Sequence, residues 1–328
     1  MSNGFNADYL IESPDYAHVM DTVVLPFLDS RGKITELAAA DGMRLFCEVW
    51  DAPQPEGTVL VLHGFTENAF KYSELIYSLL HCGFSVVAYD QRGHGRSGRA
   101  EGLPEVSDTH VDRFLDYVSD MKLVCDTLLA DMPKPWRLFS HSMGGAVSAL
   151  FLERYTDVFS AAVFCAPMIA PDTHGIPAAA ASSVCRAAKA IGRDKRHPFF
   201  MKGYSGPEDF NTSCATDPAR FAWYDSVKAS RKEFQNSVPT YRWTQESIAV
   251  TKKILAAGAP ESISIPVLLS TAENDSSVKP GPQQEFIGRV PKGRHIFVNK
   301  ARHEIYRSVN DVFFPWWHQV IEFLRHPD

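Results

Sequence analysis

The stretch WRLFSHSMGGAVSALFLERY, from Trp136 to Tyr155, decides the fold of this chain. It consists of an apolar run, a serine followed by Met and two glycines, and a second apolar run. This pattern predicts a buried strand that turns sharply into a helix, because small residues after Ser142 let the chain reverse within a short distance. The serine would then stand at the carboxyl end of the strand, with its hydroxyl held outward by a sparsely allowed backbone conformation.

Similar short apolar runs recur along the chain and alternate with segments of helical periodicity. Such alternation predicts an α/β sheet with helices on both faces. The runs expected to form buried parallel strands cover residues 58–64, 84–90, 136–142, 160–166, 265–271 and 294–300. Before them, residues 34–50 are expected to form a hairpin that turns at Asp41-Gly42 and supplies an antiparallel edge.

The clearest helix is expected from about Val111 to Leu129. Its apolar stripe follows the 3.6-residue period at positions 111, 114, 115, 118, 121, 125, 128 and 129. The opposite side is expected to face solvent and carries Asp112, Asp116, Asp120 and Lys122.

The alternation stops between about Pro167 and Ser262. That part is richer in Ala, Ser, Pro and basic residues, and residues 177–191 are compatible with a helix. We interpret it as a helical cap inserted over the sheet. The expected organisation is an α/β core in two parts, residues 1–167 and 263–328, with the cap at residues 168–262.

Composition narrows the functional classes. The chain has 328 residues and 45% hydrophobic content, enough for a core without disulfides or metals. A net charge of −6 argues against a nucleic-acid partner, since such proteins are usually basic. Six scattered cysteines without a C-x-x-C pair are typical of reduced thiols. The N-terminal stretch has neither the basic start nor the apolar region of a secretory signal. We therefore expect a cytoplasmic protein.

A serine hydroxyl is a poor nucleophile without a base. His303 follows the last predicted strand and is the best-placed base, because the side chain of His141 should diverge from that of Ser142 on a tight turn. An acid must then hold the imidazole in one tautomer. Asp275, in the loop after the strand at 265–271, is favoured over Glu273 for this role. Ser142, Asp275 and His303 are the predicted catalytic residues.

The reaction also needs donors for a developing oxyanion. The backbone N–H of Met143, directly after the nucleophile, is one expected donor. The backbone N–H of Phe65 is the other, because His63-Gly64 ends an early strand and leaves this group free to point inward. This chemistry requires no cofactor and no metal.

Two motifs need separate interpretation. The nucleophile turn reads Ser140-His141-Ser142-Met143-Gly144, with serine where the usual G-x-S-x-G pattern has its first glycine. The stretch from Gly93 to Gly98 matches G-x-G-x-x-G, but no helix follows at once, so a dinucleotide site is not expected.

The predicted cap is locally basic. It could approach anionic lipid headgroups while Phe199, Phe200 and Met201 dip into a membrane surface, for example the inner face of the membrane. A purely solvated basic face is the alternative. The basic positions are Arg186, Lys189, Arg193, Lys195, Arg196 and Lys202.

From about Thr35 to Pro327, the chain resembles α/β-hydrolases of the monoacylglycerol lipase and bacterial lysophospholipase group. The resemblance rests on HGFTENAFKY, YDQRGHGRSG, SHSMGG, the Asp275 loop and RHEIY. The cap segments FNTSCATDPARF and SVPTYRWTQESI are similar to the lysophospholipase branch. The resemblance implies a serine hydrolase of lysophospholipids or monoacylglycerols, with an acyl chain held under the Phe-bearing cap.

Three other functions stay open at this stage. A carboxylesterase of short-chain or non-lipid esters would use the same residues, and so would a peptidase similar to proline iminopeptidases. A ligand-binding protein could keep the fold without turnover. The sequence leaves the oligomeric state open.

Overall fold

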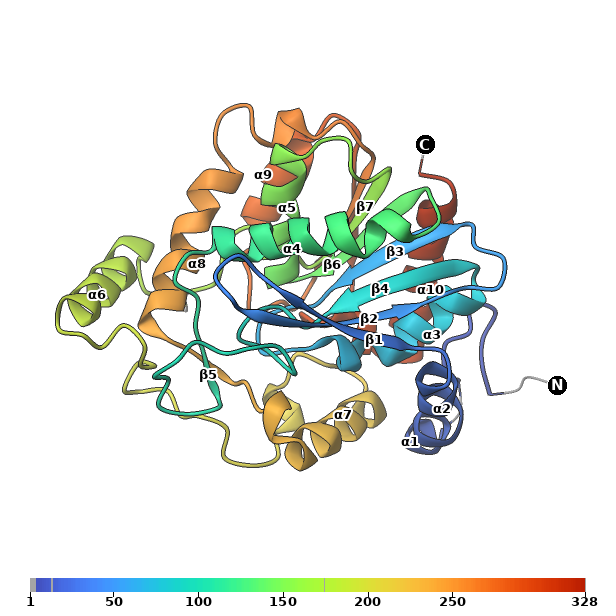
Figure 1. The fold of residues 1–328 in the computed structure, drawn as a ribbon, viewed down its shortest axis with the longest axis horizontal. Helices are drawn as coiled ribbons and strands as arrows, with labels where there is room; N and C mark the ends of the chain where they lie inside the picture. Colours follow the sequence, from blue (N-terminus) through green and yellow to red (C-terminus); the bar gives the residue numbers. More distant parts are fainter. Residues whose placement is uncertain (1–3, 13, 174, 328) are drawn as a thin grey trace.

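Figure 1 shows the fold of the computed structural model, which describes residues 4–12, 14–173 and 175–327. An eight-stranded sheet lies at its centre, in the order β1-β2-β4-β3-β6-β7-β9-β10. β2 is antiparallel to both β1 and β4, and all other neighbouring strands are parallel. The mostly parallel α/β sheet and its antiparallel hairpin edge are as predicted.

The strands lie close to the predicted ranges. The sheet consists of β1 (Lys33–Ala38), β2 (Arg44–Trp50), β3 (Gly57–Leu62), β4 (Phe84–Tyr89), β6 (Trp136–His141), β7 (Ala161–Cys165), β9 (Val267–Ala272) and β10 (Gly293–Val298). A separate pair is formed by β5 (Asp108–Thr109) and β8 (Val238–Pro239).

Helices cover both faces of the sheet (Figure 1). Buried residues of α3 (Ser73–His81) and α10 (Asn310–Arg325) belong to the apolar core on one face. Those of α4 (Leu115–Thr127), α5 (Met143–Arg154) and α9 (Pro280–Arg289) belong to the core on the other. α1 (Tyr16–Val19) and α2 (Leu25–Asp29) lie beside α3. Short helical turns cover Met20–Val24, Ala69–Tyr72, Leu129–Asp131, Phe210–Thr212, Lys232–Phe234, Pro260–Ser262 and Ile305–Arg307.

The segment between β7 and β9 contains α6 (Ala178–Ala190), α7 (Pro218–Ser230) and α8 (Tyr241–Ile254). α6 projects away from the sheet at the left of Figure 1, whereas the end of α8 packs in the same core as α5. The division of the chain at residues 167 and 262 stays a prediction, because α8 contributes to the core as well as to the inserted segment.

The expectation that the last strand is buried was wrong. β10 pairs with β9 in parallel, but it is the outermost strand of the sheet, and its first three residues are exposed. Phe297 in this strand is 50% exposed. An apolar run in the sequence does not reveal whether its strand lies at the centre or at the edge of a sheet.

The solvent-facing side predicted for α4 was also partly wrong. Asp120 is 1% exposed, and both of its carboxylate oxygens accept hydrogen bonds from Arg92 at 2.6 Å. Asp116 is buried as well, whereas Leu115 of the predicted apolar stripe is 37% exposed. A guanidinium from the loop after β4 makes burial of these carboxylates possible, and helical periodicity carries no information about such a partner.

Candidate active site

Ser142 lies between the end of β6 and the start of α5, with φ +50° and ψ −117°. This conformation is rarely adopted by residues other than glycine. It is accommodated here because Gly144 packs directly on β3: a Cβ atom at this glycine would lie 2.6 Å from the carbonyl oxygens of Leu62 and His63. The predicted sharp strand-to-helix turn is therefore present.

Ser140, the residue that replaces the usual glycine, fits the same turn. It is fully buried in β6, and its hydroxyl donates a hydrogen bond of 3.4 Å to the carbonyl oxygen of Val163 in β7. The extra atoms of serine therefore occupy space between two strands without displacing Ser142.

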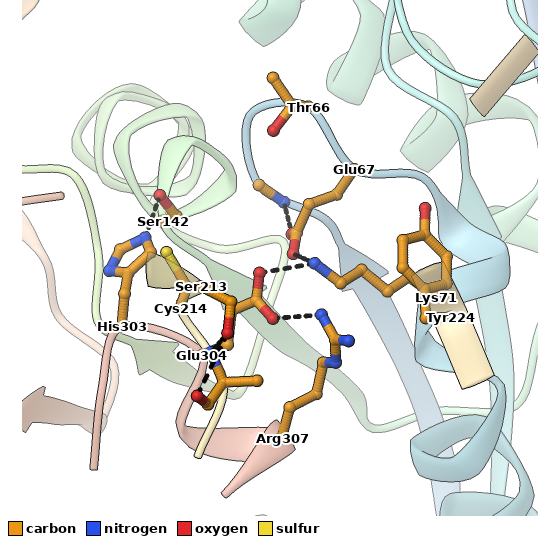
Figure 2. A network of polar contacts seen from close by, with 12 residues as sticks. Thr66, Glu67, Lys71, Ser142, Ser213, Cys214, Tyr224, His303, Glu304 and Arg307 are labelled. Atoms are coloured by element: carbon orange, nitrogen blue, oxygen red, sulfur yellow. Dashed lines mark hydrogen bonds and ion pairs between the residues drawn. The ribbon is translucent and has the colours of Figure 1, made fainter. Parts of the chain in front are cut away.

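The three predicted catalytic side chains form one hydrogen-bonded row. The Nε2 atom of His303 lies 2.8 Å from Oγ of Ser142, and its Nδ1 atom lies 2.7 Å from Oδ2 of Asp275. Figure 2 shows the imidazole directed at the serine. The residues follow β6, β9 and β10, so three parallel strands deliver them to the carboxyl edge of the sheet, where α/β proteins bind ligands.

The surroundings keep the acid ionised and the base receptive to a proton. Burial opposes the charge of His303, but the carboxylates of Asp275, Glu304 and Glu67 together outweigh burial and raise the histidine pKa above its usual value. Burial alone would raise the pKa of Asp275. The imidazole of His303 and the backbone N–H groups of Ser277 and Val278 outweigh it, so the carboxyl pKa is lowered.

The rival residues do not occupy these positions. His141 shares a hydrogen bond of 3.0 Å with the carbonyl oxygen of Cys165, and burial lowers its pKa to about 4. Glu273 accepts a hydrogen bond of 2.6 Å from the backbone N–H of Lys300. The His141 ring lies beside that of His303, with 4.7 Å between centroids, but His141 has no hydrogen bond to Ser142 among the described contacts.

The segments carrying the predicted oxyanion donors meet at the serine. Met143 is the first residue of α5, so its N–H has no carbonyl partner within the helix. A Cβ atom at Gly64 would lie 3.0 Å from Cβ of Ser142, which places the loop leading to Phe65 against the nucleophile. The oxyanion role of Phe65 and Met143 stays a prediction.

A buried ionic network beside the row was not predicted. The carboxylate of Glu67 accepts hydrogen bonds from the Gly64 backbone N–H at 2.7 Å and from Lys71 at 2.8 Å. Lys71 also reaches Glu304 at 2.6 Å, and Glu304 pairs with Arg307 at 2.5 Å (Figure 2). The network joins the loop before Lys71 to the segment that follows His303.

The sequence contains a recognisable spacing for each local ion pair of this network, but no pattern for the contact that joins the two pairs. Glu67 and Lys71 are four residues apart, and Glu304 and Arg307 are three apart, which are the spacings of local ion pairs. The contact that joins the two segments spans 233 residues. No local pattern predicts it.

The glycine-rich stretch does not form a nucleotide loop. The N–H of Gly93 bonds to the carbonyl oxygen of Gly98 at 2.8 Å, which closes the loop on itself. The next helix, α4, begins only at Leu115. Among the described residues, no group of three or more His, Cys, Asp or Glu side chains is arranged to hold a metal ion.

Comparison with known proteins agrees with this architecture. Lysophospholipase L2 of Escherichia coli K12 is 31% identical over 293 residues, which cover 84% of this chain and 82% of the relative. Monoglyceride lipase of Mus musculus is 36% identical over 138 residues, covering 42% of this chain and 43% of that protein.

A solved structure of monoglyceride lipase from Saccharomyces cerevisiae has the same fold, with a TM-score of 0.67 at 18% identity, and the match covers 89% of this chain and 95% of that one. A family model described as serine aminopeptidase, S33, matches residues 53–310. The chain therefore belongs to this S33 family of α/β-hydrolases, whose members are serine hydrolases.

Proposed function

We propose that Ser142, His303 and Asp275 are the catalytic triad of an enzyme that hydrolyses carboxylic esters of lipids. The observation that carries this proposal is the hydrogen-bonded row, 2.8 Å from serine to histidine and 2.7 Å from histidine to aspartate. His303 takes the hydroxyl proton of Ser142 as the oxygen attacks the ester carbonyl, and it returns that proton to the leaving alcohol. Water then releases the acyl group from the serine.

The backbone N–H groups of Phe65 and Met143 hold the oxyanion in this mechanism. Met143 directly follows the serine, and the loop that leads to Phe65 packs against it. Loss of one such donor typically costs about 2.7–4 kcal/mol of transition-state stabilisation.

The proposed substrates are lysophospholipids or monoacylglycerols. The names of the relatives support this choice: the similarity to a lysophospholipase extends over most of the chain, and the similarity to a monoglyceride lipase covers less than half of it. Activity on p-nitrophenyl esters of increasing chain length distinguishes a lipid esterase from a short-chain carboxylesterase. A maximum at two to four carbons would contradict the lipid assignment.

Substitution of the nucleophile tests the mechanism. We expect Ser142→Ala to lower kcat on a p-nitrophenyl ester by at least ~10³-fold and to abolish labelling by a fluorophosphonate probe. Ser148→Ala is the matched control, because Ser148 is buried in α5 away from the row. Near-normal turnover by Ser142→Ala would overturn the assignment.

A second candidate is an aminopeptidase. The family description favours it, and so do the carboxylates of Asp209 and Asp225, which line a cavity near the site and could anchor a substrate amine. Hydrolysis of proline p-nitroanilide at a kcat/KM above that for octanoyl esters would establish the peptidase instead.

We also propose that the segment from α6 to Met201 contacts an anionic membrane surface from the cytoplasmic side. Within the described residues, no helix has the length and apolar character needed to span a bilayer. The support is an exposed apolar set next to basic residues: Phe199 is 91% exposed, Ile191 70% and Phe200 63%. The six unpaired cysteines fit a reducing compartment.

Vesicle sedimentation tests the membrane contact. We expect binding to vesicles containing anionic lipid, weakened by salt and by the double substitution Phe199→Ser/Phe200→Ser. The exposed edge residue Phe297, replaced by serine, is the control, because it lies on β10 outside this region. Equal binding by both variants would contradict the proposal.

A further inference from the structure

A cavity of about 400 Å³ lies between the inserted segment and the loops that carry the active site. On the core side it is lined by Thr66, which follows Phe65, and by Glu304, which follows His303. On the other side it is lined by residues 203–209 and by α7. Its size is that of a small-ligand site, and Figure 2 shows Thr66, Lys71 and Glu304 near the catalytic row.

The lining is charged and carries more negative than positive groups. Each of its three cations has an ion-pair partner: Lys71 and Arg307 pair with Glu304, and Lys228 pairs with Glu208. Two further carboxylates, Asp209 and Asp225, form no ion pair among the described residues. Glu67, which also pairs with Lys71, adds another negative charge next to the cavity. An acyl chain would be poorly solvated here, whereas a polar group with a positive end would be attracted.

Two further features point to a polar ligand. Tyr204 and Ser237 line the cavity, and their hydroxyl oxygens are buried without a hydrogen-bond partner among the described residues. The Nε atom of Arg307, whose side chain is 9% exposed, is likewise buried without a partner. Buried polar groups are normally hydrogen-bonded, so a polar ligand that reached these atoms would supply partners that the protein lacks.

We propose that this cavity is the headgroup subsite of the enzyme and that it favours lysophospholipids whose headgroup ends in an ammonium, such as choline or ethanolamine, over anionic ones. The inference rests on the proposed ester hydrolysis. In such a lipid the phosphate is nearer to the scissile ester than the ammonium is. The phosphate therefore falls at the end nearer Glu304, where Lys71 and Arg307 offset the carboxylates of Glu304 and Glu67. The ammonium falls on the side of Asp225, which is half-buried, and Asp209, which is exposed.

Headgroup competition with soluble substrates tests this subsite. Octanoyl lysophosphatidylcholine, octanoyl lysophosphatidylglycerol and monooctanoylglycerol are compared below their critical micelle concentrations, so that no lipid surface contributes. Each kcat/KM is divided by that for p-nitrophenyl octanoate, which has no headgroup. The test variant is Asp225→Asn, whose side-chain oxygen can still accept the hydrogen bond from the Glu208 backbone N–H. The control variant is Asp157→Asn, at an exposed position on the connection between α5 and β7.

We expect the wild-type protein to prefer the choline substrate over the phosphoglycerol substrate by about tenfold, equivalent to about 1.4 kcal/mol. Asp225→Asn should reduce this ratio several-fold by raising KM for the choline substrate, and Asp157→Asn should leave it unchanged. Equal wild-type rates on both lysophospholipids, faster cleavage of monooctanoylglycerol, or equal effects of both variants would overturn the headgroup assignment. Failure to cleave p-nitrophenyl octanoate, or faster cleavage of proline p-nitroanilide, would instead overturn the proposed function.

Discussion

The carboxylate of Glu67 holds the backbone N–H of Gly64 at 2.7 Å, one residue before the predicted oxyanion donor Phe65. The same carboxylate accepts hydrogen bonds from Tyr72 at 2.6 Å and from Tyr306 at 2.5 Å, in addition to the ion pair with Lys71. Glu67 is therefore fixed by four donors from three parts of the chain. It fixes the loop that leads to Phe65 and packs against the nucleophile.

We expect Glu67→Gln to lower kcat by about 10–100-fold with a smaller change in KM, because the oxyanion loop loses its charged anchor while the triad remains. Burial lowers the pKa of His303, and the carboxylates of Asp275, Glu304 and Glu67 raise it. Removal of the Glu67 charge should therefore also move the acidic limb of the pH–rate profile to lower pH. Glu322→Gln, an exposed change on α10, is the control. A purely structural role would reduce the amount of folded protein but leave the limb in place.

The pH profile of the wild-type enzyme follows from the same histidine. His303 acts as a base only when it is neutral, so kcat/KM should rise with pH through a pKa above the usual histidine value of about 6.5. Asp275→Asn should lower kcat by up to ~10⁴-fold and shift the residual profile toward lower pH, since the carboxylate that raises the histidine pKa is gone. An acidic limb below pH 6 in the wild-type protein would contradict the assigned base.

The catalytic row and the ionic network beside it differ in how far the sequence could predict them. The order of Ser142, Asp275 and His303, each after an apolar run, was enough to predict that they meet, because parallel strands end at one edge of the sheet. The Glu67–Glu304 network could not be predicted in this way. Its two halves come together through the packing of distant loops, and charge spacing within one segment cannot identify a partner in another.

The errors in the fold have the same origin. Residues 294–300 and residues 84–90 are both short runs with apolar residues, yet β4 is fully buried and β10 is an exposed edge. The difference lies in what covers each strand, which is a property of the whole sheet. The burial of Asp120 likewise depends on Arg92, which lies 28 residues away.

The serine at position 140, where the G-x-S-x-G pattern has a glycine, should have little effect on catalysis. We expect Ser140→Gly to keep kcat/KM within about twofold, because the serine contacts β7 through one long hydrogen bond and not the nucleophile. It should lower the free energy of unfolding by about 0.5–1 kcal/mol through the greater backbone freedom of glycine in a strand. Ser140→Val should cost more, about 1–3 kcal/mol, because the site is fully buried. Urea denaturation with ester assays measures both effects, and a large loss of kcat in Ser140→Gly would refute this interpretation.

Arg92 is expected to be important for stability, because it is the ion-pair partner of a buried carboxylate. Arg92→Leu leaves Asp120 buried without its partner and should lower the free energy of unfolding by about 3–5 kcal/mol at pH 8. Burial, opposed by Arg92, already raises the pKa of Asp120 to about 6 in the wild-type protein. Without Arg92 this pKa rises further, so protonation favours the folded state and the loss should be smaller at pH 5 than at pH 8.

Two comparisons isolate this ion pair. The double variant Arg92→Leu/Asp120→Leu should recover most of the lost stability, because no uncompensated charge remains in the core. Arg113→Leu removes an arginine whose side chain is 75% exposed and which pairs with Asp116, so its cost should stay below about 1 kcal/mol. Equal shifts of the urea midpoint in Arg92→Leu and Arg113→Leu would contradict this explanation. So would a double variant that is less stable than Arg92→Leu alone. Either result would mean that Arg92 does not stabilise the protein by pairing with the buried charge of Asp120.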